Sequence, residues 1–276
     1  VSDNTDLDIT DNLTVMVWAK YNSATPLNET MVAKHDIGLN YREYLFRVGS
    51  SQKLQVYIGD DGGSSAVVIE SDFSISDLDS LNLYAWTFKS GEVVLSRNGI
   101  SIDSTASGGV PTSLTPNLSD LSIGCFFNSG SKTSIMDGQV VDVRIYAGTS
   151  SVLTDAEILS IYQNPSANIN FDGQTLAARY KLAEGSGEIC YDSSGNNNHG
   201  TIENAASNWG VTQDLVHSNF LEGHSIYEHA SSDPIRVPFG SDGQPLSITP
   251  PAGYSKTSDN YAGDYHNDAE TTVDFN

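Results

Sequence analysis

The chain has 276 residues, and its 13 Lys and Arg against 35 Asp and Glu give a formal charge of −22 at pH 7. Nucleic acids and anionic membrane surfaces repel such a protein, so we expect neither as a partner. The 38% of hydrophobic residues suffices for a packed core, and no apolar run approaches the roughly 20 residues that a membrane-spanning helix needs. Two cysteines, Cys125 and Cys190, are too few for a disulfide framework, and the choice between buried thiols and one disulfide stays open.

Apolar and polar residues alternate through the first 150 residues, which is the pattern of strands that bury one face. In the first run Leu13, Val15 and Val17 share one face of a strand. The runs in this part of the chain cover residues 13–20, 44–48, 54–58, 84–88 and 93–95. Short strands separated by Gly, Asn, Asp and Ser turns are typical of antiparallel sandwiches and barrels, so we expect an all-β fold.

An Asn-Gly pair, Asn98-Gly99, marks the clearest turn. It separates the run at 93–95 from a return run at 100–102. Because both residues tolerate positive φ, the pair predicts a β-hairpin. Two later runs, residues 121–125 and 141–145, indicate two more strands.

One short helix is expected after these strands. Thr154 and Glu157 have the spacing of a capping box, and Pro165 prevents the helix from continuing. Residues 166–176 then have the composition of a linker. Residues 251–276 are rich in Gly, Asp and Tyr with little apolar periodicity, so we expect an extended acidic tail there.

Several strings in the first 165 residues resemble laminin-G-like domains of the concanavalin A-like lectin/glucanase superfamily, in its bacterial and phage branch. The strings that carry the resemblance are LTVMVWAK, MVAKHD, YLFRVGSSQKLQVYIGDDG, GQVVDVRIY and LTDAEILSIYQNP, and they occur in the family's order. The resemblance implies a jelly-roll sandwich of two antiparallel sheets for residues 1–165.

The resemblance departs at the start of the chain. Such a domain usually opens with a strand and an Asp-Ser-Ser-Gly and Asn-His-Gly loop, and here that opening stands at residues 177–250. The body, residues 1–165, therefore lacks its own first strands. We expect 177–250 to pack on the body of the same chain, by circular permutation, or to be donated to a neighbour in a homo-oligomer.

A polar, turn-forming stretch, residues 191–200, is a candidate calcium site. Its Asp and Asn side chains offer the hard oxygen ligands that Ca²⁺ prefers. The resemblance implies a further ligand from the last strand of the body, where such domains often hold a structural calcium. The candidate ligands are Asp142, Asp192, Asn196 and Asn198. Alternatively, the loop side chains satisfy their own backbone in Asx turns, and Asp142 pairs with Arg144.

The aromatic residues of the strands allow carbohydrate binding. An exposed aromatic ring stacks on sugar C–H groups, and amides and carboxylates beside it bind the hydroxyls. The alternative is that these aromatic side chains belong to the core. The candidate ligand-binding residues are Trp18, Tyr41, Tyr57, Tyr84 and Trp86.

Glycosidase chemistry requires two carboxylates that face each other across a cleft. Glucanases of the resembled superfamily carry them as Glu-x-Asp-x-x-Glu on one strand, and this chain has no such string. Glu184 and Glu188 are four residues apart, but the Gly-Ser-Gly between them is typical of a turn. We therefore expect a protein that is not an enzyme, and keep a divergent polysaccharide lyase or glycosidase as an alternative.

These observations favour a non-catalytic module of a larger surface assembly. We expect a phage virion structural protein, such as a fibre, an appendage or a capsid decoration, with adhesion or glycan-binding capacity. Its partners would be other subunits and a host cell-surface glycan, and its location the virion or the extracellular space. Because the chain begins at Val1 and not at Met, we expect a processed or excised piece. The alternative is a secreted bacterial carbohydrate-binding module of a polysaccharide-degrading enzyme.

Overall fold

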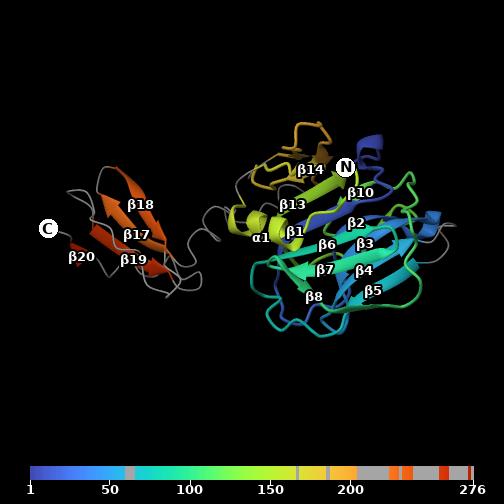
Figure 1. The fold of residues 1–276 in the computed structure, drawn as a ribbon, viewed down its shortest axis with the longest axis horizontal. Helices are drawn as coiled ribbons and strands as arrows, with labels where there is room; N and C mark the ends of the chain where they lie inside the picture. The colour runs from blue at the N-terminus through green and yellow to red at the C-terminus, as the bar shows by residue number, and fades with distance from the viewer. Residues whose placement is uncertain are drawn as a thin grey trace. The chain divides into compact units, whose positions relative to one another are not determined.

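The computed structural model describes most of the first 203 residues and the backbone of four later strands. The chain divides into two units, one made of residues 1–162 with 167–212 and the other of 163–166 with 213–276. Figure 1 shows that strands dominate the first unit. The described residues are 1–59, 66–165, 168–184, 187–203, 224–229, 232–238, 255–260 and 273–274.

Six antiparallel strands form one sheet of the first unit. In β1, Val15 lies opposite Ile145 on one side and Trp86 on the other, so the alternating run at 13–20 forms a central strand. Its strands, in spatial order, are β14 (Gln174–Tyr180), β13 (Gly138–Gly148), β1 (Leu13–Tyr21), β6 (Asn82–Lys89), β7 (Glu92–Arg97) and β8 (Ile100–Ile102).

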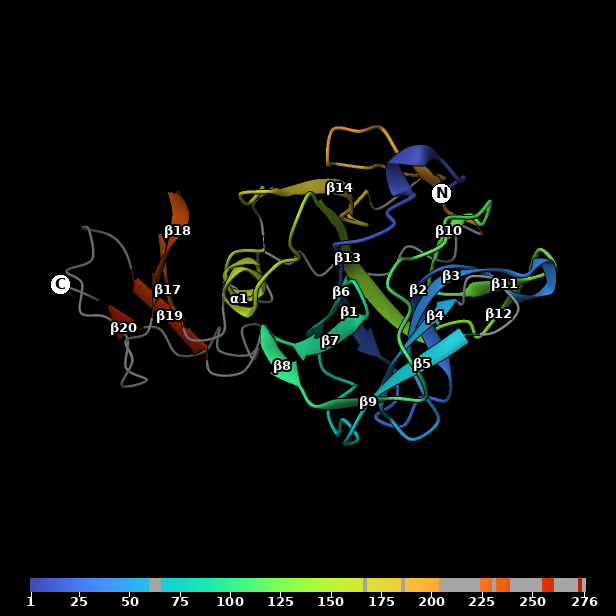
Figure 2. The same ribbon diagram turned by 45° about the vertical axis from the view of Figure 1, so that its right-hand side comes forward.

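Eight strands form the second sheet, in which β3, β4 and β5 lie side by side (Figure 2). Phe46 on β3 lies opposite Val32 on β2 and Val56 on β4, which places the three apolar side chains on one face. The strands, in spatial order, are β12 (Ser131–Thr133), β11 (Phe126–Asn128), β2 (Glu29–Asp36), β3 (Tyr41–Val48), β4 (Leu54–Gly59), β5 (Ala66–Ser71) and β9 (Ser104–Ala106), with β10 (Leu121–Ile123) also paired to β2.

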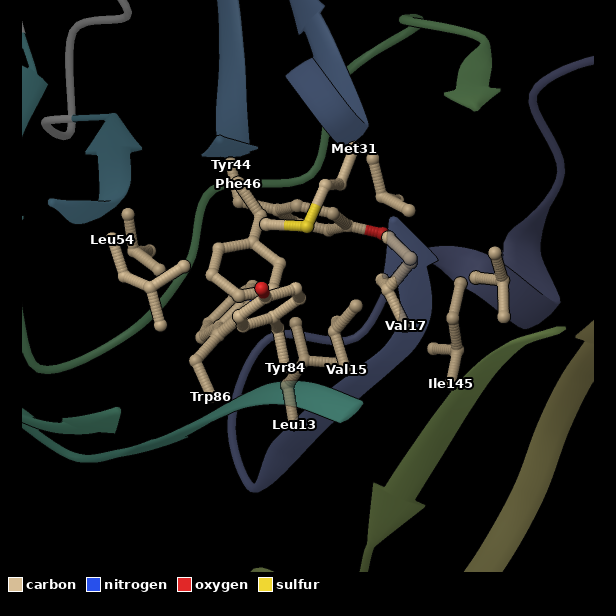
Figure 3. Close-up of a cluster of buried hydrophobic side chains, with 14 of the residues drawn as sticks. Leu13, Val15, Val17, Met31, Tyr44, Phe46, Leu54, Tyr84, Trp86 and Ile145 are labelled. Atoms are coloured by element: carbon tan, nitrogen blue, oxygen red, sulfur yellow. The ribbon is translucent and has the colours of Figure 1, made fainter. Parts of the chain in front are cut away.

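Side chains from both sheets meet in one hydrophobic core. Leu13, Val15 and Val17 of β1 point into the same cluster as Phe46 of β3 and Leu54 of β4 (Figure 3). Each of these five side chains is fully buried. The expected all-β jelly-roll sandwich of two antiparallel sheets is therefore confirmed.

The hairpin predicted at Asn98-Gly99 is present between β7 and β8, with φ of 52° and 78° at the two residues. A second constraint acts on Gly99, because a Cβ at this position would lie 2.5 Å from the Cα of Leu159. Leu159 belongs to the helix α1 (Asp155–Gln163), so the turn and the helix lie in direct contact.

The capping box predicts the start of α1 correctly. The Thr154 backbone N–H donates to the Glu157 carboxylate over 2.7 Å, and the Glu157 N–H donates to the Thr154 hydroxyl over 3.4 Å. Ile158 and Ile161 are the buried residues of the helix. Two short 3₁₀ helices, η1 (Thr5–Leu7) and η2 (Ile37–Leu39), are also present. Among the described residues, no helix has both the length and the apolar character to cross a membrane.

The last part of the first unit adds a strand to the six-stranded sheet. β14 pairs antiparallel with β13, with Arg179 opposite Arg144. It begins at Gln174, inside the segment 166–176 that was expected to be a linker. A two-stranded ribbon follows, made of β15 (Ile189–Cys190) and β16 (Gly200–Thr201). Cys190 and Cys125 are both buried free thiols.

The second unit has its own antiparallel sheet. Its strands, in spatial order, are β18 (Ser232–Pro238), β17 (His224–His229), β19 (Ser255–Asn260) and β20 (Val273–Asp274). The structure thus differs from the expected boundaries, because residues 177–250 are divided between two units and 251–276 contain two paired strands. The polar sequence of β19, SKTSDN, has no apolar residue, and so gave no alternating signal.

Candidate functional site

The Asp-Val-Arg-Ile-Tyr string of β13 builds a buried ionic cluster. Asp142 Oδ2 lies 3.1 Å from Arg144 Nη2 and 2.6 Å from Arg179 Nη2, and the exposed fraction of the three side chains is at most 2%. The guanidinium of Arg144 also lies 4.9 Å from the ring centre of Trp18. Because Arg144 and Arg179 are cross-strand partners, the carboxylate between them allows two like charges to face each other.

Asp192 joins the following loop to the edge of the sheet. Its Oδ1 accepts the backbone N–H groups of Arg179 and Ser194, both over 2.9 Å, and its Oδ2 accepts the N–H of Asn198 over 3.0 Å. The side-chain amides of Asn196 and Asn198 donate to the carbonyl oxygen of Ala177 over 2.8 and 3.3 Å. The loop therefore covers, with polar side chains, the edge of β14 that faces away from β13.

The four candidate calcium ligands all make hydrogen bonds or ion pairs within the protein. Asp142 is occupied by two guanidinium groups, and Asp192 accepts N–H donors. The side-chain amide nitrogens of Asn196 and Asn198 donate to the carbonyl oxygen of Ala177, whereas asparagine ligates Ca²⁺ through its amide oxygen. Within the described ranges no cluster of three His, Cys, Asp or Glu side chains could hold a metal ion. The loop makes the backbone contacts of the Asx-type alternative, and calcium binding at these residues stays a prediction.

Three of the five candidate sugar-binding aromatics are wrong. Trp18, Tyr84 and Trp86 are fully buried and cannot offer a ring face to a ligand. Tyr84 and Trp86 point into the core between the sheets (Figure 3). Trp18 lies on the opposite face of β1 and is covered by Arg144. Alternation in a strand cannot distinguish a ring in the core from a ring in solvent when both faces of the sheet are covered.

The other two candidates, Tyr41 and Tyr57, are partly exposed and lie in different places. Tyr41 begins β3 opposite Asp36. The carboxylate of Asp36 holds the adjoining loops together, because it accepts backbone N–H groups over 2.7 to 3.2 Å from Gly38, Leu39, Ser129 and Gly130. Burial acts to raise the pKa of Asp36, but these four hydrogen bonds together lower it by more. The pKa therefore lies below its ordinary value.

Tyr57 belongs to a group of polar side chains on the outer face of the eight-stranded sheet, which we call the outer-face cluster. Its members are Arg47 of β3, Lys53 directly before β4, Gln55 and Tyr57 of β4, and Glu70 of β5. Arg47 lies opposite Gln55, which lies opposite Glu70. Their strand neighbours Phe46, Val56 and Ile69 are buried in the core, so the cluster faces away from it.

Hydrogen bonds fix the members of the outer-face cluster to one another. Arg47 Nε donates to Gln55 Oε1 over 2.9 Å, and Arg47 Nη2 donates to the Tyr57 hydroxyl. The Arg47 guanidinium also lies over the Tyr57 ring, 4.6 Å from its centre. Gln55 Nε2 donates to one oxygen of Glu70, and Lys53 Nζ lies 3.2 Å from the other.

All five members of the cluster are half-buried, and the hydrogen bonds between them fix their positions. The arrangement combines an aromatic ring, an amide, a carboxylate and two cations, which is the mixture that recognises sugars. Sequence reasoning identified Tyr57 but missed Arg47, Lys53, Gln55 and Glu70. The polar positions of each strand were visible, but the register that aligns three strands was not.

A second buried ionic cluster fastens the residues before β1. Lys34 is fully buried, and its Nζ lies 2.6 Å from Asp8, 2.9 Å from Asp3 and 3.0 Å from Glu43. Burial raises the pKa of Glu43 to about 7, although the neighbouring Lys34 lowers it. Burial acts to lower the pKa of Lys34, but the three carboxylates together raise it by more. The pKa therefore lies above its ordinary value, and the amine stays charged.

The two packed sheets and the capped helix α1 define a jelly-roll β-sandwich. A laminin G-type family model, described as the concanavalin A-like lectin/glucanases superfamily, matches residues 1–159. The chain belongs to this family, and the resemblance is confirmed over residues 1–159.

Several solved structures are similar to this chain. Domain 4 of AbnA, a GH43 extracellular arabinanase from Geobacillus stearothermophilus in complex with arabinotriose, is 15% identical over 57% of this chain and 69% of its own, with a TM-score of 0.37. The CBM40 of the Ruminococcus gnavus IT-sialidase bound to α2,3 sialyllactose is 12% identical over 56% and 84%, with a TM-score of 0.44. A heptameric SAP-like pentraxin from Limulus polyphemus is 14% identical over 56% and 72%, with a TM-score of 0.38. No curated protein matches the sequence.

Proposed function

We propose that this chain is a non-catalytic module that binds glycans at the outer-face cluster. The observation that carries the proposal is the position of Tyr57, whose half-exposed ring is held by Arg47 beside the amide of Gln55 and the carboxylate of Glu70. Because these side chains are already bonded to one another, little conformational entropy is lost when a sugar binds.

The carboxylates of the two polar regions support a binding role over catalysis. The outer-face cluster has one carboxylate, Glu70, and both of its oxygens are bonded to other members. Glycoside hydrolysis uses two carboxylates, one of which must deliver a proton. Asp142, in the other polar region, is buried between two arginines and cannot reach a substrate.

The finer proposal concerns where the module works. We propose that it is extracellular and belongs to a larger surface assembly, in particular a phage virion, as a fibre, an appendage or a capsid decoration. The resemblance of its strings to the bacterial and phage branch of the family supports this proposal. The strongly negative net charge also favours solubility when many copies stand close together.

A glycan array probed with the full chain tests the binding proposal. We expect selective binding that Tyr57→Ala reduces at least tenfold, because the substitution removes the ring and the partner of Arg47. Tyr191→Ala is the matched control, since Tyr191 is an exposed tyrosine outside the cluster, with 52% of its surface exposed. Equal loss in both variants, or no loss in Tyr57→Ala, would overturn the assignment of the site.

A further inference from the structure

We propose that the outer-face cluster selects acidic glycans, which carry a carboxylate or a sulfate group, over neutral ones. This inference rests on the proposed function and adds the ligand class to it. It follows from which polar atoms of the cluster are already bonded, from the local charge, and from how the Arg47 guanidinium is held.

The hydrogen bonds within the cluster use its acceptors. Glu70 receives Lys53 on one oxygen and Gln55 on the other, and the Gln55 carbonyl oxygen receives Arg47. Among the described residues the donors are used less completely, since Lys53 makes one hydrogen bond and Arg47 makes two. An ammonium has three N–H donors and a guanidinium has five. The unused capacity is therefore mostly that of donors, which suits a ligand rich in acceptors.

The charge of the cluster is opposite to that of the chain. Arg47 and Lys53 contribute two positive charges and Glu70 one negative charge, so the cluster carries a net charge of +1 on a chain of −22. At physiological ionic strength the Debye length is about 8 Å, so distant carboxylates are largely screened from a ligand at the cluster. The nearby cations therefore dominate the electrostatics of contact.

The guanidinium of Arg47 is already oriented for an anion. Its Cζ lies over the Tyr57 ring, 4.6 Å from the ring centre, and its Nε donates to Gln55. A planar guanidinium held in one orientation pairs with carboxylate or sulfate oxygens through two parallel hydrogen bonds, which a sugar hydroxyl cannot match. Tyr57 would contact the sugar ring, and Arg47 would contact the acidic group.

The test is a calorimetric titration of the full chain at 0.15 M NaCl with matched oligosaccharides. We use a neutral oligogalactoside, an oligogalacturonide and a sulfated oligogalactoside of equal length. We expect the acidic ligands to bind at least tenfold more tightly than the neutral one, and the better of the two identifies carboxylate or sulfate as the recognised group. Arg47→Gln should abolish this preference, whereas Lys89→Gln should keep it. Lys89 lies at the exposed end of β6 and changes the net charge equally.

The outcomes separate the ligand class from the proposed function. Equal or tighter binding of the neutral oligosaccharide, with loss of binding in Tyr57→Ala, would overturn the acidic class and leave the glycan site in place. A preference for acidic ligands that survives Arg47→Gln would also overturn the inference. If the chain binds no oligosaccharide of the panel or of the array, both proposals are overturned.

Discussion

At the scale of single residues, Glu43 links the stability of the fold to pH. Burial raises its pKa from an ordinary value of 4.5 to about 7, so the folded chain keeps a proton that the unfolded chain has lost between these values. The contribution of Glu43 to the free energy of unfolding is therefore complete below pH 4.5 and is lost as the pH rises through about 7.

Replacing Glu43 by Gln removes this titration. We expect the midpoint of thermal unfolding of Glu43→Gln to fall less between pH 5 and pH 8 than that of the wild type. His35 provides a control of opposite sign, because burial and Arg42 lower its pKa from 6.5 to about 4. Its contribution is complete above pH 6.5 and is lost as the pH falls through about 4, so His35→Gln should flatten the acid side instead. A wild-type profile retained in Glu43→Gln would contradict the assignment.

Asp142 stabilises two buried arginines at once. Its replacement by Asn removes the carboxylate that both Arg144 and Arg179 contact, and we expect a loss of about 3 kcal/mol in the free energy of unfolding. Asp77→Asn is the matched control. Asp77 pairs with Arg97 near the surface, and this substitution should cost under about 1 kcal/mol. Denaturant titration measures the free energy of unfolding of both variants. Equal losses would rule out a special role for the buried ionic cluster of Asp142.

At the scale of elements, the loop after β15 protects an edge. Asp192 and Asn196 bond backbone groups of β14 that would otherwise face solvent, and exposed strand edges promote association. We expect the double variant Asp192→Ala, Asn196→Ala to form dimers or larger species at concentrations where the wild type does not. Light scattering coupled to size-exclusion chromatography measures this.

Asn197→Gly provides the control for that experiment. Asn197 lies in the same loop with a φ of 62°, which glycine adopts readily, so the substitution should leave the loop on the edge of β14. Dimers in Asn197→Gly, or monomers in the double variant that is still folded by circular dichroism, would show that the loop does not protect the edge.

Strands with a run of alternating apolar residues were predictable, even where both faces are buried as in β1 and β6, and strands without such a run were not. β1, β3, β4 and β6 alternate, and each was identified within a few residues. β2 was missed because Lys34, His35 and Asp36 are buried in it, so a charged string occupies interior positions. Their burial depends on partners that come from distant parts of the chain, such as Asp8 and Gly130.

The candidate site follows the same rule. Tyr57 could be chosen because its side chain belongs to the polar face of its own strand, away from the apolar residues Val56 and Ile58. Its partners Arg47 and Glu70 could not, because they come from two other strands and meet only when the register places Gln55 between them. Trp18 was misassigned because a second layer covers the outer face of the six-stranded sheet, and no local pattern reveals such a layer.

At the scale of the whole molecule, the first unit depends on residues beyond its predicted body. β14 supplies the pairing partner of β13, and Arg179 supplies one of the two cations bound to Asp142. We expect a chain of residues 1–212 to unfold cooperatively as a monomer, and a chain of residues 1–165 to aggregate or fail to fold. Scattering and thermal denaturation followed by circular dichroism compare the two.

A cooperative, monomeric 1–165 chain would contradict this dependence. The wild-type chain is the reference for both pieces, because it contains the second unit that both lack. A 1–212 piece that unfolds at the temperature of the wild-type body would show that the second unit adds nothing to the stability of the first.

The loop on β14 also restricts how copies of this protein can be joined. Two copies brought together at this side would meet amide and hydroxyl groups that are already engaged, so neither could extend the other's hydrogen-bonded ladder. A joint made there would consist of side-chain contacts alone. Such a joint can open and close repeatedly, under load or on dilution, while each subunit keeps its own architecture intact.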